Sequence, residues 1–264
     1  MSIFSPQSFV FLIYVFGYDD YGDGMSIKKE ISELDVEDSM AGMVDLLMKA
    51  LDEVENTRDT ELLMTIKSKV DEAEDYYWRP IDSTEFYERL SSILREMGHE
   101  DDANEYLKRV GIIESTRYEI LGKIWNFIGN NTLAYEYYSK AVELWPENSI
   151  AKKGMERTRK RIEKAKKNLD KLSSRKDTKG RLDYISALLD LGIVDRAREE
   201  IEKINGDDFS VKLMKARIMA AENKWEDAMA IAEELKKIDP GAVNPRRIIN
   251  YARFMLGDEE DIED

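Results

Sequence analysis

Cysteine is absent from this 264-residue sequence, and histidine occurs once, as His99. The lack of cysteine excludes disulfides, thiolate nucleophiles and metal sites built on thiolates. It also suits a reducing compartment, so we expect a cytoplasmic protein. A single histidine excludes multi-histidine metal sites and leaves any His-centred catalytic triad dependent on one residue. The glycine motifs of phosphate loops, dinucleotide sites and nucleophile elbows are missing as well. We therefore expect a protein that is not an enzyme, with no catalytic residues, no metal and no cofactor.

Positive charge is in short supply over the whole chain. Lys and Arg number 40 against 55 Asp and Glu, which gives a formal net charge of −15. This balance argues against general binding of nucleic acid or of anionic membranes, although a local basic patch can override it. Hydrophobic residues make up 42% of the sequence, which is enough for a sizeable core.

Residues 1–24 differ from the rest of the chain. Their apolar run, Phe9–Phe16, has eight residues, whereas a helix that spans a bilayer needs about 20. No basic residue precedes this run, as a secretory signal requires. Three interpretations stay open: an upstream extension before a natural start at Met25, an apolar segment that packs on the body, and a weak membrane anchor. We expect no stable insertion into a membrane.

Residues 25–83 show helical periodicity and predict an N-terminal helical hairpin. Apolar residues recur three and four positions apart on two faces, with a break at residues 56–60. The first face holds Met40, Met43, Val44, Leu47, Leu51 and Val54, and the second holds Leu62, Leu63, Ile66, Val70, Ala73 and Tyr77. No stretch outside the N-terminal run alternates with the period of a strand, so we expect an all-α protein.

The region from residue 84 contains an internal repeat. Its best copy consists of Tyr118, Leu121, Gly122, Trp125, Gly129, Ala134, Tyr138, Ala141 and Pro146. The same frame recurs around Ala103, Ala197 and Ala228. In every copy a turn residue precedes the small alanine by five positions: Gly98, Gly129, Gly192 and Asn223. Small residues permit two helices to cross closely, and glycine can end a helix in the left-handed conformation.

This pattern resembles the tetratricopeptide (TPR) repeat over about residues 84–256. The resemblance implies a right-handed superhelical array of antiparallel helical hairpins, an α-solenoid, over residues 84–264, closed by a capping helix in 245–264. It further implies a protein–protein adaptor or scaffold that binds a peptide or helix of a partner in the concave groove of the array.

Groove-lining positions follow from the same frame. They are Glu85, Glu88, Ser92, Arg95, Glu119, Lys123, Asn126 and Phe127. Acidic residues stand where the TPR subclass that clamps a chaperone carboxylate needs positive charge. A basic or mixed-charge ligand, with Phe127 as an apolar contact, is therefore favoured.

One long central helix is expected from about residue 149 to 172, with Asn148 as its N-cap. Residues 155, 158, 162, 165, 169 and 172 form a narrow apolar seam on this helix. Such a seam needs a partner helix in this chain or in another, so self-association through 155–172 is one possibility.

Residues 152–181 carry 14 basic and four acidic residues, a net charge of +10. The candidate basic patch comprises Arg157, Arg161, Lys164, Lys167 and Lys171. One interpretation is a solvated helix that complements the acidic repeats of the same chain. The other is a surface that binds an acidic partner or phosphates, which makes a nucleic-acid-associated protein the alternative function. The segment has no aromatic residue, so base stacking is not supported.

Overall fold

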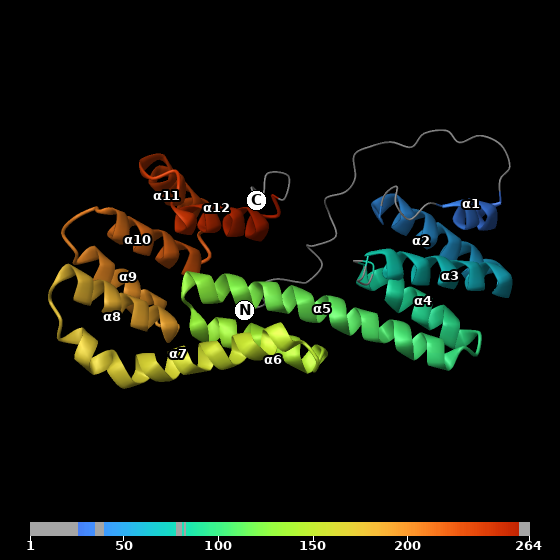
Figure 1. Cartoon of the computed structure of the whole chain (residues 1–264), viewed down its shortest axis with the longest axis horizontal. Helices are drawn as coiled ribbons and strands as arrows, with labels where there is room; N and C mark the ends of the chain where they lie inside the picture. The colour runs from blue at the N-terminus through green and yellow to red at the C-terminus, as the bar shows by residue number, and fades with distance from the viewer. Residues whose placement is uncertain (1–25, 35–39, 78–80, 82, 259–264) are drawn as a thin grey trace. The chain divides into compact units, whose positions relative to one another are not determined.

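The computed structural model describes residues 26–34, 40–77, 81 and 83–258. Over these residues the chain forms twelve α-helices and no strand, which confirms the all-α prediction (Figure 1). The segment 1–24 lies outside the described residues, and its three interpretations stay open. The helices are α1 (Ile27–Glu33), α2 (Met40–Thr57), α3 (Thr60–Tyr77), α4 (Thr84–Glu96), α5 (Glu100–Ile128), α6 (Asn131–Leu144), α7 (Ser149–Ser173), α8 (Thr178–Asp190), α9 (Val194–Glu202), α10 (Phe209–Ala221), α11 (Trp225–Ile238) and α12 (Val243–Leu256).

The chain divides into two compact units, a first unit of Met1–Thr116 and a second unit of Arg117–Asp264. The division falls inside α5 and does not coincide with the division at residue 84 that the sequence suggests. The helix that follows residue 84, α4, packs on α2 within the first unit.

The first unit is built around the predicted hairpin of α2 and α3, which pack on each other and are joined by a short turn. Arg58 takes a left-handed φ of 58° in this turn, and the Asp59 carboxylate accepts from the N–H groups of Glu61 and Leu62 at 2.8 and 3.1 Å. This carboxylate caps the first turn of α3. The apolar faces predicted from the spacing meet in one core with α1 and α4, and Leu47, Leu51, Leu62, Leu63, Ile66, Val70, Phe86 and Leu90 are fully buried there.

Helix α5 joins two segments that the repeat frame treats as separate helices. The frame assigns Ala103 to the second helix of one copy and Tyr118 to the first helix of the next. The structure makes them parts of one 29-residue helix. The residues between them include Gly111 but no proline, so no residue in the stretch removes a backbone donor and forces a break.

The turn residues of the repeat frame adopt a positive φ in all four copies. The φ values of Gly98, Gly129, Gly192 and Asn223 are 86°, 102°, 72° and 61°, so each lies in the left-handed region that ends helices. The alanines five positions later, Ala103, Ala134, Ala197 and Ala228, are all fully buried.

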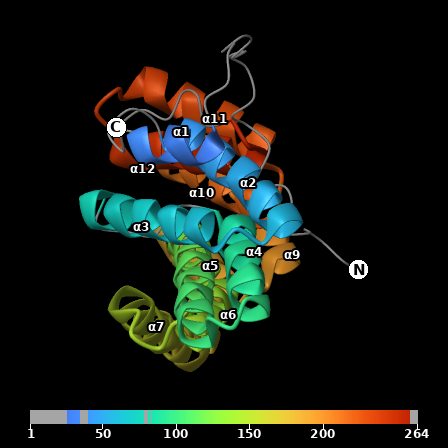
Figure 2. The same ribbon diagram turned by 90° about the vertical axis from the view of Figure 1, so that its right-hand side faces the viewer.

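In the second unit each helix from α6 to α12 packs on the next one along the chain, and α10 also packs on α8 and α12. The predicted long helix is confirmed as α7, whose N-cap is Asn148, with its side chain accepting from the Ala151 N–H at 2.9 Å. Helices α6 and α7 run alongside each other (Figure 1 and Figure 2). The last predicted helix is present as α12, which ends at Gly257 in a left-handed C-cap.

The end of α5 packs against the last helices of the second unit. The rings of Trp125 and Trp225 meet edge to face at 5.7 Å, and those of Phe127 and Tyr251 at 5.3 Å. One core therefore extends from α5 through α12. Side chains 100 or more residues apart in the chain meet in it.

Candidate functional site

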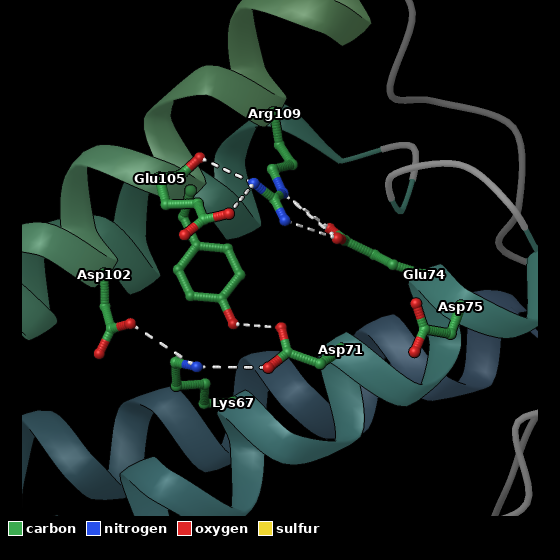
Figure 3. A pocket seen from close by; sticks show the side chains of 8 residues that line it. Lys67, Asp71, Glu74, Asp75, Asp102, Glu105 and Arg109 are labelled. Atoms are coloured by element: carbon green, nitrogen blue, oxygen red, sulfur yellow. Dashed lines mark hydrogen bonds and ion pairs between the residues drawn. The ribbon is translucent and has the colours of Figure 1, made fainter.

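A hollow of about 280 Å³ in the first unit is lined mainly by charged side chains from α3 and from the start of α5 (Figure 3). The lining residues are Lys67, Asp71, Glu74, Asp75, Asp102, Glu105, Tyr106 and Arg109. A cluster of this kind is the usual place to look for a catalytic or ligand-binding site, so the state of each charge in it matters.

Both cations of the hollow are held by carboxylates. Arg109 donates from Nε and Nη2 to the Glu74 carboxylate at 3.1–3.4 Å, and from Nη1 to Glu105 Oε1 at 3.1 Å. Lys67 Nζ lies 3.3 Å from Asp71 Oδ2 and 3.6 Å from a carboxylate oxygen of Asp102. Within the described part of the chain this is an ion-pair network that ties α3 to α5, and both positive charges are already neutralised.

Tyr87 and Tyr106 stack on each other beside this network, with ring centroids 5.9 Å apart. Tyr87 donates to Glu74 Oε1 at 2.6 Å, and Tyr106 donates to Asp71 Oδ1 at 3.0 Å. Burial, together with the neighbouring carboxylate, raises the pKa of both phenols, so they act as fixed neutral donors. We conclude that the cluster has a structural role and holds α3 and α5 together in the first unit.

The predicted groove residues of α4 lie on the surface of the first unit. Glu85, Glu88, Ser92 and Arg95 are all exposed, and among the residues that the structure describes only Arg95 of these four has a side-chain partner, Asn104 Oδ1 at 3.2 Å. These side chains are free to meet a ligand. They do not line either of the two hollows described in this section.

The predicted groove residues of α5 belong to the second unit and are engaged within it. Glu119 is buried, and its carboxylate lies 2.5 Å from Nζ of the exposed Lys123. Asn126 Nδ2 donates to Asn131 Oδ1 at 2.6 Å. The Glu119–Lys123 pair lies within α5, and the Asn126–Asn131 hydrogen bond links the end of α5 to the start of α6.

Phe127 has a similar internal role. Its ring meets the ring of Tyr251 of α12 edge to face. The guanidinium of Arg247, which is also on α12, lies 5.8 Å from the centroid of the Phe127 ring. Phe127, which the repeat frame predicts as an apolar contact for a ligand, therefore packs on the last helix of the same chain.

Sequence reasoning missed a polar cluster at the turn between α5 and α6. Asn131 donates to the Asp190 carboxylate at the end of α8 and to the Gly129 carbonyl at 3.4 Å. Arg217 of α10 donates to the carbonyls of Ile128 and Phe127 at 2.8 and 3.1 Å, which satisfies the end of α5. The run of Gly and Asn at 129–131 signals a turn, but no local pattern links it to positions 190 and 217.

Burial controls the charges of that cluster. Burial raises the pKa of Asp190, while the hydrogen bond from Asn131 and the positive charges of Arg161 and Arg217 oppose the rise. Burial likewise lowers the pKa of the Arg217 guanidinium. The group joins α5, α6, α8 and α10.

The predicted basic patch lies on the exposed side of α7 in the second unit. All five residues, Arg157, Arg161, Lys164, Lys167 and Lys171, are exposed. The buried side of α7 carries Ala151, Thr158 and Ala165, with Met155 and Leu169 half-buried against the core. Helices α6 and α8 pack on α7, so the seam at 155–172 has its partner helices inside this chain.

Two of the basic residues that follow α7 form contacts inside the fold, whereas Lys176 and Lys179 are exposed. Arg175 pairs with Asp177 and Asp183 at 3.3 and 2.9 Å, and Arg181 donates to the carbonyl of Lys203 at 2.8 Å. Most of the accessible positive charge of the predicted basic segment therefore lies on α7, whose ten basic residues are all exposed.

A second hollow, of about 460 Å³, lies between α6, α7 and the turn that follows α8. Its walls are partly apolar, with Ile162, Leu191 and Ile193. The rest of the lining is Thr132, Tyr135 and Glu136 of α6 and Lys166 of α7.

In the residues that the structure describes, no three Asp, Glu or His side chains are placed to hold a metal ion. None of the described helices combines the length and the apolar character that crossing a bilayer demands. No protein-family model matches the chain, and no curated protein matches it.

Proposed function

We propose that this protein is a non-catalytic, cytoplasmic adaptor that binds a protein partner. One observation carries the proposal: α7 exposes a strongly basic surface on a protein of net charge −15. Within α7 there are ten basic and three acidic residues. A local reversal of charge sign attracts an acidic partner to one face and disfavours its encounter with the others.

The repeat frame supports the same role. Its four turn residues have left-handed φ values, and its four alanines are buried. Both features are typical of TPR-like helical hairpins and support the proposal of a helical-hairpin array. Arrays of this kind present side chains from rigid helices and position a partner without chemistry.

The contacts inside the chain favour α7 over α5 as the binding surface. The α5 residues Glu119, Asn126 and Phe127 already have partners in the second unit. The cations of α7 point into solvent. A partner on α7 displaces no contact of the fold.

Affinity capture from the source organism's lysate tests the adaptor role. The bait is the full chain on resin, the lysate is split into nuclease-treated and untreated halves, and bare resin is the control. We expect at least one protein to be retained at equal yield in both halves. Retention of nucleic acid, with every protein lost on nuclease treatment, would reject the adaptor role.

A nucleic-acid-associated role is the second candidate, and it rests on the same exposed cations of α7. Neutralised phosphates release counterions, so binding of a duplex should weaken steeply as salt rises. An electrophoretic mobility series with 20-base-pair DNA and RNA at rising salt tests this role. Absence of a shift at 50 mM salt would remove it.

A further inference from the structure

The exposed face of α7 repeats every seven residues with the same charge at each position. We define row A as Arg157, Lys164 and Lys171, and row B as Lys153, Lys160 and Lys167. The acidic row is Glu156, Glu163 and Asp170, and row C is Lys152, Arg159 and Lys166. All twelve side chains are exposed.

The same seven-residue period runs along the buried face. Ala151, Thr158 and Ala165 are buried at successive seven-residue steps, and α6 and α8 cover this side of the helix. A period of seven keeps each row almost parallel to the helix axis, with a drift of about 20° per repeat. Members of one row are therefore about 10.5 Å apart along the helix, at about 1.5 Å per residue.

The order of the rows around α7 follows from its 3.6 residues per turn: row C, the acidic row, row B and then row A. The acidic row is paired on both sides, because Glu156 lies 2.7 Å from Lys160 of row B and Glu163 lies 3.9 Å from Arg159 of row C. Row A makes no ion pair with any described residue. Rows A and B together form the accessible positive strip.

We propose that rows A and B dock an acidic α-helix of the partner protein, about three heptads long. A helix with Glu or Asp at two positions of each heptad presents negative charge at the same spacing as these rows, along their full length. A Lys at a third position of each heptad meets the acidic row. The pattern therefore selects a partner by both attraction and repulsion.

The acidic row favours an acidic helix over a nucleic acid as the ligand of this strip. A phosphate backbone has negative charge everywhere and offers no positive group to Glu156, Glu163 and Asp170. A helix can place a positive residue opposite each of them. The lack of Phe, Tyr and Trp in α7 also removes the stacking platform that single strands use.

The test uses two synthetic peptides of identical composition and the full-length protein. The patterned peptide is a 24-residue Ala-based helix with two Glu and one Lys per heptad at the matching positions. The scrambled peptide has the same residues without the period. Fluorescence anisotropy at 150 mM salt is expected to show at least tenfold tighter binding of the patterned peptide.

Two charge-reversal variants of α7 locate the contact. The row A variant, Arg157→Glu/Lys164→Glu/Lys171→Glu, is expected to lose at least tenfold in affinity for the patterned peptide. The row C variant, Lys152→Glu/Arg159→Glu/Lys166→Glu, carries the same charge change on the same helix and should stay within threefold of wild type. Circular dichroism checks that both remain helical. If row A reversal unfolds the protein, Arg157→Gln/Lys171→Gln replaces it, with a loss of at least threefold expected.

Four results would overturn the docking mode: no binding of the patterned peptide at 1 mM, equal binding of the two peptides, equal losses in the two variants, or tighter binding of a 20-base-pair duplex than of the peptide. A peptide-induced change in sedimentation toward dimers would assign the strip to a second copy and would also overturn the docking mode.

The inference rests on the proposed adaptor role. A protein captured equally by wild type and by the row A variant would refute the docking mode and leave the adaptor role standing.

Discussion

The ring of Tyr138 on α6 lies so close to Gly154 on α7 that a methyl group at position 154 would stand 2.5 Å from the ring. A methyl group at Gly122 on α5 would meet the same ring at 2.7 Å. Tyr138 is thus packed against two glycines on two helices. Its aromatic ring fills the space that the missing side chains leave.

Replacing Gly154 by alanine should destabilise the second unit. The new methyl group has to displace the buried Tyr138 ring or push α6 and α7 apart, and overpacking of this kind costs about 1–3 kcal/mol. Urea unfolding followed by tryptophan fluorescence measures the loss. Gly241→Ala is the control, because its methyl group meets only Asp239 Oδ1 at 3.5 Å. Equal midpoints for wild type and Gly154→Ala would contradict the packing.

Alkaline pH should weaken the second unit through Tyr138. Burial raises the pKa of this phenol from 10.0 to about 12, with the charge of Arg157 opposing the rise. The phenol ionises in the unfolded chain near pH 10 but stays neutral in the folded protein. Its contribution to stability is therefore complete below pH 10 and is lost between pH 10 and 12.

The Tyr138→Phe variant isolates that effect, because it keeps the ring and removes the titrating group. We expect the free energy of unfolding of wild type to fall relative to this variant as the pH rises from 9 to 11.5. The other tyrosines are common to both proteins, so their titrations cancel in the difference. A constant difference over this range would show that the Tyr138 phenol titrates normally.

Loss of the Arg217 guanidinium should loosen the end of α5. Arg217→Met leaves the carbonyls of Phe127 and Ile128 without this donor, and an unsatisfied buried acceptor costs about 1–3 kcal/mol. Arg198→Met on α9 is the matched control. The Arg198 side chain is partly exposed and pairs with Asp195 and Glu222, and Glu222 keeps Lys224 at 2.8 Å as a second partner, so the loss of Arg198 should cost less than about 1 kcal/mol. Equal losses in a urea titration would show that Arg217 makes no special contribution.

A double-mutant cycle should show strong coupling between Arg109 and Glu74 in the first unit. Both side chains are largely shielded from water, so we expect a coupling energy of about 1–2 kcal/mol from Arg109→Met, Glu74→Gln and the double variant. The exposed pair of Arg58 and Glu96, at 2.8 Å, should couple by less than about 1 kcal/mol. Thermal unfolding followed by far-ultraviolet circular dichroism measures both cycles, and similar coupling in the two would mean that burial adds nothing to the first pair.

The local features of the fold were open to sequence reasoning because they depend on near neighbours in the chain. Asn148 signals the start of α7 by its ability to cap, and the glycines at 98, 129 and 192 signal turns by their freedom at positive φ. Gly122 and Tyr138 were also expected at a close helix crossing, where the structure places them. Gly154 was not recognised, since nothing near it in the sequence points to Tyr138.

Long-range contacts were beyond reach. Apolar periodicity shows which face of a helix is buried, but it does not show which helix covers that face. Phe127 therefore looked like a ligand contact, whereas Tyr251 of α12 packs on it. The network of Asn131, Asp190 and Arg217 was missed for the same reason. The basic side chains of α7 were expected at the surface because such charges avoid burial, and they lie there.

A chain of repeats in which each one touches only its neighbours can fray from either end. The second unit should not fray in this way. The edge-to-face contacts of Trp125 with Trp225 and of Phe127 with Tyr251 form a clasp, by which we mean that they hold the first helical segment of the unit against its last two helices. Neither end can peel away before the clasp opens. Amide protons of α12 should accordingly exchange about as slowly as those in the middle of the unit, and the unit should melt as one cooperative block.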